Sequence, residues 1–145
     1  MKFLVINGPN LNLLGLREPA IYGSRSFAAL QDFIRASAAE AGVEVELFQS
    51  NHEGAIVDAI QPAYGTADGI VINPAAYTHT SVAILDALKA VAIPAVEVHL
   101  SDVDAREPFR HVSYAGLACF TRFTGLGFEG YRQAVLALME RLNAG

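Results

Sequence analysis

The chain has 145 residues, the length of one domain, and its 52% of hydrophobic residues against 17% of charged residues excludes a disordered chain. Its net charge of -5, without any basic block, argues against nucleic-acid binding, because phosphate contacts need lysine and arginine side chains. We therefore expect one domain over residues 1–145. So apolar a composition also suggests surface that is buried between subunits.

The expected compartment is the cytoplasm. Cys119 is the single cysteine, so it has no internal partner, which fits a reducing environment. The first expected strand begins at Lys2, with no leader before it. No apolar stretch reaches the roughly 18 residues of a membrane span, so no membrane partner is expected.

The first half of the chain predicts two strands and a helix. A buried strand is expected over residues 2–6, and a long segment rich in Gly, Pro and Asn follows over residues 7–25. Ser26 is the expected N-cap of a helix that ends near Gly42, and alternating Val and Glu predict an edge strand over residues 43–49. Loops as long as 7–25 are usually functional or disordered, and we expect a mobile lid there.

Helices and strands continue to alternate in the second half. The expected elements are a helix over 53–64, a strand over 68–72, a helix from Thr80 or Ser81 to about 90, a strand over 94–98, a helical turn within 102–111, a strand over 117–124 and a helix over 126–142. This order predicts an α/β fold of three layers (α/β/α), with a five-stranded parallel sheet in the flavodoxin-like order 2-1-3-4-5.

Polar groups follow three of the apolar runs. Asn7 to Asn10 follow the first strand, Asn73 to His79 follow the third, and His99 to Asp102 follow the fourth. Ligands of such sheets bind beyond the carboxyl ends of the strands. Amides, imidazoles and hydroxyls at these ends suit a small polyhydroxy molecule.

Arg17 and Tyr22 lie together on the long loop. A tyrosine is a weak base at neutral pH, but a neighbouring guanidinium favours its phenolate form. The pair is either a general base, or an aromatic plug beside a solvated charge.

His99 ends the fourth strand, and Glu97 lies two residues earlier on the same side of that strand. An imidazole there can act as a general acid or base near neutral pH. A carboxylate within an apolar strand must be paired or neutral. The pair is either catalytic or a structural hydrogen bond.

Other candidates are ligand-binding groups. Asn73 offers both amide functions or merely opens a turn, and His79 donates to a ligand hydroxyl or contacts a helix start. The backbone N–H groups of Leu100 and Ser101 can grip a carboxylate. Arg110 lies four residues after Arg106, so that one of the two can reach a ligand.

The sequence lacks the motifs or residues that several other kinds of site would need. The sequence contains no Walker A motif, no G-x-G-x-x-G motif and no metal-ligand spacing of histidines. The two lysines, Lys2 and Lys89, lie away from the strand ends, where a Schiff base would need them. Acid–base catalysis without a cofactor or a metal is what remains.

Five segments carry these polar residues in one order. They are Ile6-Asn-Gly-Pro-Asn-Leu-Asn-Leu-Leu-Gly15 with Arg17-Glu-Pro and Tyr22-Gly23, then Ser50-Asn-His-Glu-Gly54, Asn73-Pro-Ala-Ala-Tyr-Thr-His-Thr-Ser81, Glu97-Val-His-Leu-Ser101 and Arg106-Glu-Pro-Phe-Arg110. Together they resemble the signatures of type II 3-dehydroquinate dehydratases, and the resemblance runs from Lys2 to the last helix.

The resemblance implies a hydro-lyase that dehydrates 3-dehydroquinate to 3-dehydroshikimate through an enolate. By this analogy Tyr22, helped by Arg17, removes a proton next to the ketone. Asn10 holds the water that stabilises the enolate. His99 protonates the departing hydroxyl, and Glu97 orients or balances it.

The resemblance also assigns binding residues and an assembly. Asn73, His79 and Arg110 would bind ring hydroxyls, and the amides of Leu100 and Ser101 would bind the carboxylate. The family forms dodecamers built as four trimers, in which Asp86 would reach a neighbour's site. The reaction serves the shikimate pathway of aromatic amino acid biosynthesis or, alternatively, quinate breakdown.

The chain departs from the family pattern at three positions. Asp102 and Asp104 stand where Asn and His are common, and Ala75 stands where Gly is common. The two aspartates add negative charge near a site for an anionic substrate. They would weaken binding unless they point to solvent or pair with Arg106.

Three other readings remain. A flavin-binding electron carrier of this fold would need a Ser/Thr-rich phosphate loop after the first strand, where this chain has Asn7-Gly-Pro-Asn. A signalling receiver would need aspartates at the strand ends. An inactive relative that serves as a flavodoxin-like binding protein is the third reading, although all the matched polar residues are present.

Overall fold

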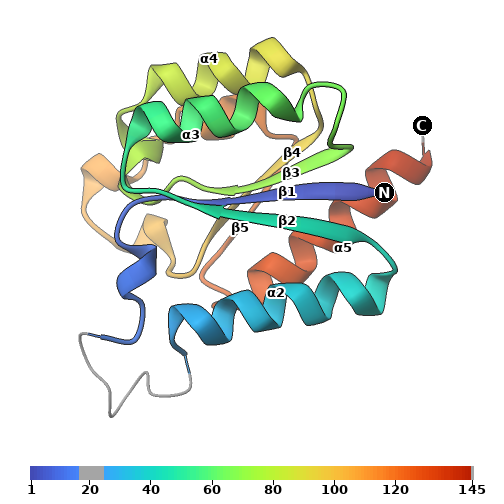
Figure 1. Cartoon of the computed structure of the whole chain (residues 1–145). Coiled ribbons are helices and arrows are strands. Elements are labelled where there is room, and N and C mark those ends of the chain that lie inside the picture. Colours follow the sequence, from blue (N-terminus) through green and yellow to red (C-terminus); the bar gives the residue numbers. More distant parts are fainter. Residues whose placement is uncertain (17–24, 145) are drawn as a thin grey trace.

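The sheet has five parallel strands in the predicted order. The structure is a computed structural model that describes residues 1–16 and 25–144. Its strands are β1 (Lys2–Asn7), β2 (Glu44–Gln49), β3 (Gly69–Asn73), β4 (Ala95–His99) and β5 (Thr121–Thr124). They pair in the order β2-β1-β3-β4-β5, so the flavodoxin-like prediction is confirmed. Figure 1 shows this sheet between two layers of helices.

Helices cover both faces of the sheet (Figure 1). Helices α2 (Phe27–Ala41) and α5 (Glu129–Ala144) cover one face, and α3 (Glu53–Ile60) and α4 (Val82–Val91) cover the other. Strand β1 serves both cores, because Phe3 packs with the first pair of helices and Leu4 with the second. Among the described residues, none of the helices combines the length and apolar composition needed to cross a bilayer.

The predicted helix caps are confirmed. The Ser26 hydroxyl accepts a hydrogen bond from the Ala29 amide at 3.1 Å, and α2 ends at Gly42, whose φ of 76° is left-handed. Of the two candidate caps for α4, Ser81 is the cap, and its hydroxyl accepts from the Ile84 amide at 3.0 Å.

The last predicted strand, over 117–124, is partly wrong. Only its second half is β5, because residues Ala115–Ala118 close a 3₁₀ turn. Cys119 therefore follows a turn instead of lying in a strand, and its thiol donates to the Ala115 carbonyl at 3.3 Å.

Two predicted helices have different bounds. Helix α3 ends at Ile60 and a 3₁₀ turn, Gln61–Ala63, continues it, since Pro62 lacks a backbone donor. The closing helix begins at Glu129 and not near 126, because Gly125 and Gly127 have left-handed φ angles of 78° and 59°.

Candidate active site

The ends of β1, β3 and β4 bring their polar residues to one edge of the sheet. Asn7 and Asn73 are partners in the β1–β3 register, and His99 ends β4 next to β3. All three side chains are buried. The chain therefore places amides and an imidazole where ligands of parallel sheets bind.

Tyr131 of α5 joins the two asparagines. Its hydroxyl donates to Asn7 Oδ1 at 2.6 Å and accepts from Asn73 Nδ2 at 2.9 Å. Burial raises the pKa of Tyr131, against the hydrogen bond from Asn73, so the phenol stays protonated. Sequence reasoning missed this residue, since an amphipathic helix shows only that Tyr131 faces the core.

The orientation of the Asn73 amide is fixed from both ends. Its Oδ1 accepts from the Ala75 amide at 3.1 Å while its Nδ2 donates to Tyr131. Ala75 has a left-handed φ of 53°, which explains why glycine is common at this position in the family it resembles. One N–H of Asn73 remains for a ligand, because no described residue accepts from it.

The loop after β1 is pressed against the loop after β3. A Cβ on Gly8 would lie 2.4 Å from the Pro74 carbonyl oxygen, so no side chain fits there. Asn10 follows with an exposed side chain and a left-handed φ of 70°, and its amide donates to Asn51 Oδ1 at 2.9 Å. The Asn10 side chain is thus left available at the edge of the site.

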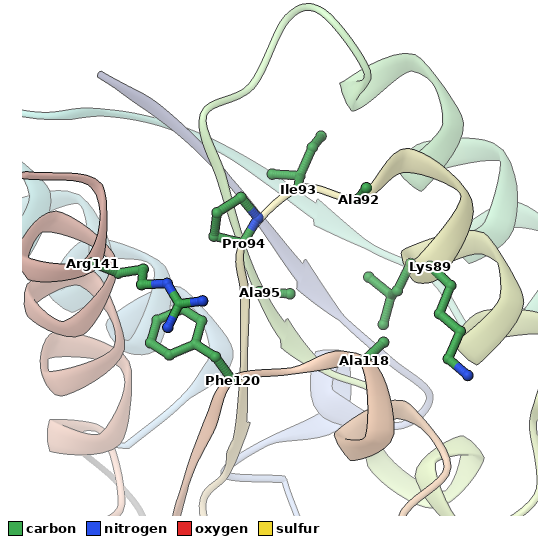
Figure 2. Close-up of a pocket in the computed structure, with 9 residues that line it drawn as sticks. Lys89, Ala92, Ile93, Pro94, Ala95, Ala118, Phe120 and Arg141 are labelled. Carbon is green, nitrogen blue, oxygen red and sulfur yellow. The ribbon is translucent and has the colours of Figure 1, made fainter. Parts of the chain in front are cut away.

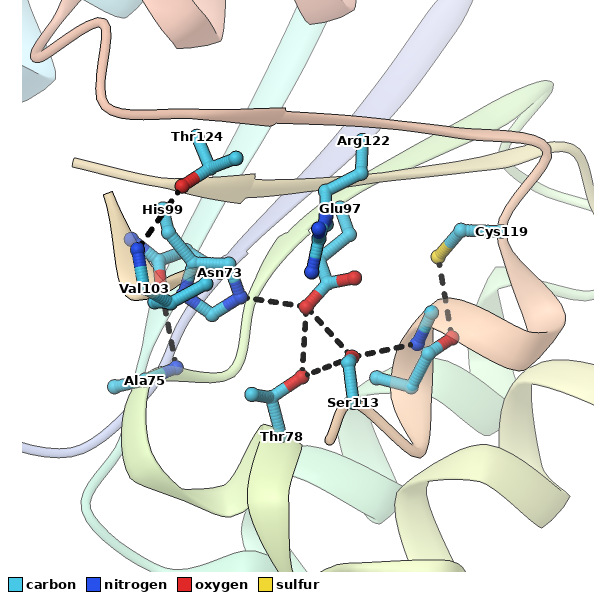
Figure 3. Close-up of polar contacts among 12 residues, drawn as sticks. Asn73, Ala75, Thr78, Glu97, His99, Val103, Ser113, Cys119, Arg122 and Thr124 are labelled. Carbon is cyan, nitrogen blue, oxygen red and sulfur yellow. Dashed lines mark hydrogen bonds and ion pairs between the residues drawn. The ribbon is translucent and has the colours of Figure 1, made fainter. Parts of the chain in front are cut away.

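His99 and Glu97 form the expected hydrogen-bonded pair (Figure 3). Nε2 of His99 lies 2.5 Å from Oε2 of Glu97, and the two side chains are 6% and 0% exposed. No described residue binds Nδ1 of His99. With Nε2 held by the carboxylate, Nδ1 is the nitrogen that can exchange a proton with a ligand.

Two hydroxyls, which the sequence analysis did not name as site residues, also bind Glu97 of this pair. Thr78 Oγ1 and Ser113 Oγ donate to Glu97 Oε2 at 2.8 Å and 2.7 Å (Figure 3). Burial raises the pKa of Glu97, but the hydrogen bond and charge of His99, with the two hydroxyls, outweigh it, so this pKa lies below its usual value. Glu97 is therefore an ionised partner for an imidazolium.

His79 lies at the end of the turn after β3. Its Nδ1 is 2.8 Å from the Val112 carbonyl, so that Nδ1 carries the proton. The neutral ring therefore presents Nε2 as an acceptor, and it donates to a ligand hydroxyl only when protonated.

Arg110 lies in a turn that packs against the His79 turn. Its Nε donates to Glu107 at 2.7 Å, and its guanidinium lies over the Phe109 ring at 5.1 Å. Both contacts fix the plane of the guanidinium, whose remaining N–H groups suit a hydroxyl or carboxylate.

The carbonyls of Leu100 and Ser101 each accept a hydrogen bond from a residue near the end of β5. Leu100 accepts from the Gly127 amide at 3.1 Å, and Ser101 accepts from the Thr124 hydroxyl at 3.0 Å. Neither amide N–H has a hydrogen-bond acceptor within residues 1–16 and 25–144. This leaves two oriented donors beside His99, as an anion site requires.

Three predicted site residues are not brought together here. Arg17 and Tyr22 lie outside the described residues. Asp86 is exposed on α4, and no described side chain pairs with it.

The two unusual aspartates are engaged with other groups. Asp104 pairs with Arg122 at 3.1 Å, and not with Arg106. Asp102 Oδ1 accepts from the Asp104 amide at 3.0 Å and so caps a turn. Both negative charges are thereby tied to local structure.

Two cavities among the described residues lie away from this edge of the sheet. One of about 250 Å³ lies beside the start of β4, between Lys89, Phe120 and Arg141 (Figure 2). A second, of about 320 Å³, is lined by Arg25, Leu126 and Phe128. Neither contains a predicted site residue.

Comparison with known proteins agrees with this architecture. Residues 1–139 match the family described as "Dehydroquinase class II". The chain is 61% identical over 134 residues to "Catabolic 3-dehydroquinase 1" of Aspergillus terreus, with 92% of this chain and 88% of that protein covered. It is 54% identical over 143 residues to the "3-dehydroquinate dehydratase" of Vibrio parahaemolyticus, with 99% and 96% covered.

A solved structure, the type II dehydroquinase of Butyrivibrio crossotus, has the same fold. It superposes with a TM-score of 0.90 at 52% identity and covers 96% of this chain and 97% of that one. Sequence and structure agree over nearly the whole chain, which belongs to the class II dehydroquinase family.

Proposed function

We propose that the chain dehydrates 3-dehydroquinate to 3-dehydroshikimate, as a single catalytic domain over residues 1–145. The observation that carries the proposal is the buried pair of His99 and Glu97 beside Asn73, at the ligand-binding edge of the sheet. Membership of the family supports it.

The first step is removal of the proton next to the ketone. Tyr22 accepts this proton as a phenolate, and the guanidinium of Arg17 stabilises the phenolate. Both assignments rest on the motif that they share with the family. The electron pair left behind forms an enolate, which a water molecule held by Asn10 stabilises.

The second step is expulsion of the hydroxyl group. The imidazolium of His99 gives its Nδ1 proton to the leaving oxygen, which departs as water while the carbon–oxygen bond breaks. Glu97 stabilises the imidazolium before transfer and keeps Nε2–H in place afterwards. The proposed steps use groups of the protein and one bound water, without a cofactor or a metal.

Five groups hold the substrate. Asn73, His79 and Arg110 bind ring hydroxyls, and the amides of Leu100 and Ser101 bind the carboxylate. The fixed amide of Asn73 and the fixed guanidinium of Arg110 support this arrangement. Preorganised donors lose little freedom when the substrate binds.

The assembly is a dodecamer of four trimers, in which Asp86 reaches a neighbour's site. Asp86 is exposed, and Val82, one turn earlier on α4, exposes half of its surface. Native mass spectrometry should detect twelve copies. A monomer with full activity would contradict the role of Asp86.

The chain acts in the cytoplasm and in the shikimate pathway. Its one cysteine fits a reducing compartment. Quinate breakdown is the second candidate, because relatives at 57–61% identity are named catabolic 3-dehydroquinases. Disruption of the gene separates the two roles, since only a biosynthetic enzyme is needed for growth without aromatic amino acids.

Turnover is tested with chelator-treated protein and 3-dehydroquinate, by following ultraviolet absorbance of the conjugated product. Absorbance should rise with wild type, survive borohydride, and stay flat with His99→Ala and Tyr22→Phe. His111→Ala, which removes an exposed histidine, is the matched control and should retain activity. A flat trace from folded wild type would overturn the proposal and favour a binding protein.

A further inference from the structure

The two oxygens of the Glu97 carboxylate have very different surroundings (Figure 3). Oε2 has three partners: His99 Nε2 at 2.5 Å, Ser113 Oγ at 2.7 Å and Thr78 Oγ1 at 2.8 Å. Oε1 is enclosed and has no partner within the described part of the chain. All of the hydrogen bonding is thus directed to the oxygen that faces the histidine.

The hydroxyls of Thr78 and Ser113 also contact each other. Their oxygens lie 2.6 Å apart, and Ser113 Oγ accepts from the Gly116 amide at 3.0 Å. Three oxygen–oxygen contacts, Thr78–Glu97, Ser113–Glu97 and Thr78–Ser113, therefore share only two hydroxyl protons. Whichever way the protons are arranged, at least one hydroxyl donates to the ionised carboxylate.

The backbone around the cluster is fitted to it. A Cβ on Gly116 would lie 2.6 Å from Glu97 Oε1 and 3.0 Å from Ser113 Oγ. The Tyr114 amide donates to the Thr78 carbonyl at 2.7 Å, which ties the segment with Ser113 to the turn with Thr78. These backbone contacts hold both hydroxyls at Glu97.

We propose that Thr78 and Ser113 are a mutually substituting pair of positioning residues, which keep Glu97 ionised and its Oε2 against Nε2 of His99. The inference rests on the proposed function, because it assigns His99 as the acid. Loss of one hydroxyl leaves the other to donate to Glu97. Loss of both leaves a buried carboxylate with His99 alone.

The other charged or titratable neighbours of Glu97 do not replace these donors. Arg122 lies beside Glu97 in the β4–β5 register, but it is paired with Asp104. Burial and the charge of Glu97 raise the pKa of Cys119 to about 12, so this thiol is neutral. His79, on the same turn as Thr78, is bound to the Val112 carbonyl.

The test compares Ser113→Ala, Thr78→Val and the double variant over pH. Each single variant should lower kcat about two- to tenfold, the effect of one lost hydrogen bond. The double variant should lose more than the product of the single effects, with KM nearly unchanged. Its acid limb of kcat/KM should move to higher pH, because the pKa of Glu97 rises without the donors.

Two controls separate positioning from general damage. Thr66→Val removes a hydroxyl that donates to the Pro62 carbonyl far from Glu97, and it should leave rate and pH profile unchanged. Ser113→Thr keeps a hydroxyl and should retain the wild-type profile. A folded double variant with wild-type rate, or with an unshifted acid limb, would overturn the inference.

If the double variant does not fold, a second measurement on wild type and the single variants tests the inference. The proton on Nε2 of His99 is observed by NMR in ¹⁵N-labelled wild type and in both single variants. Its far-downfield shift should move further downfield in each single variant, because Oε2 becomes a stronger acceptor when it loses one donor. Equal shifts in all three proteins would overturn the inference. This readout needs no turnover, so failure of the proposed function is distinguishable from failure of the positioning role.

Discussion

Tyr131 carries one of the few buried hydroxyls at the ligand edge, and its role extends beyond packing. Its single hydroxyl satisfies Asn7 and Asn73, which come from two different strands. An amide held in this way has one orientation, and so its free N–H points in one direction. Tyr131 therefore connects α5 with Asn73 at the end of β3, the residue proposed to bind a ligand.

Tyr131→Phe should lower the free energy of unfolding by about 1–3 kcal/mol, because Asn7 Oδ1 and Asn73 Nδ2 lose their buried partner. KM should rise more than kcat falls, since Asn73 binds substrate in this account. Urea unfolding and steady-state kinetics measure the two effects. Wild-type values for both would show that the bridge is dispensable.

Glu97 also makes stability depend on pH. Its pKa is lowered in the folded protein, so ionised Glu97 contributes stability above its ordinary pKa of 4.5, and the contribution is lost as pH falls through the lowered value. Between about pH 6 and pH 3, the stability advantage of wild type over Glu97→Gln should shrink.

Exposed Glu140 provides the control for this prediction. Glu140→Gln should follow the wild-type curve of unfolding free energy against pH. A wild-type advantage over Glu97→Gln that stays constant, or grows, on acidification would contradict the ionised state of Glu97.

At the residue scale, the sequence predicts contacts between side chains that lie on the same strand. Glu97 and His99 alternate along β4, so period two already places both side chains on one side. It missed Thr78, Ser113 and Tyr131 because each reaches the site from a different element. No local period encodes contacts between Ser113 and Glu97, 16 residues apart, or between Tyr131 and Asn7, 124 residues apart.

At the element scale, the order of strands was predictable and the ends of elements were less so. Runs such as residues 70–72 are too apolar to be anything but buried, and serine or glycine marks the helix ends. The first half of the predicted strand over 117–124 is also apolar, yet residues 117–118 belong to a turn. Composition does not distinguish the two, because the turn is fixed by hydrogen bonds such as Gly116 to Ser113.

The junction of β1 and β3 depends on one glycine. Gly8→Ala would bring a Cβ against the Pro74 carbonyl, where neither backbone can yield, and should lower the free energy of unfolding by about 1–3 kcal/mol. Gly54→Ala is the matched control, because a Cβ on Gly54 in α3 would meet no atom within 4 Å beyond its chain neighbours and its own helix backbone.

Gly54→Ala should raise the free energy of unfolding by up to about 1 kcal/mol through helix propensity. Denaturant titration measures the free energy of unfolding of both variants, Gly8→Ala and Gly54→Ala. Equal and small changes in the free energy of unfolding would mean that the loops after β1 and β3 do not need to lie so close together.

At the scale of the whole molecule, the single cysteine reports on the integrity of the fold. The pKa of Cys119 is raised to about 12 by burial and by Glu97. Alkylation near pH 8 should therefore be about three orders of magnitude slower in the native protein than after denaturation. Mass spectrometry of iodoacetamide labelling measures the ratio, and rapid native labelling would contradict the raised pKa of Cys119.

At the scale of the whole molecule, the proposed mechanism divides the reaction between Tyr22, which would take the proton, and His99 at the end of β4, which would complete the elimination. The most direct test is proton exchange by His99→Ala in deuterated water, with 3-dehydroquinate followed by NMR. The account predicts that the variant incorporates deuterium next to the ketone and forms no 3-dehydroshikimate. Unexchanged substrate, or product formed at the wild-type rate, would contradict this division of roles.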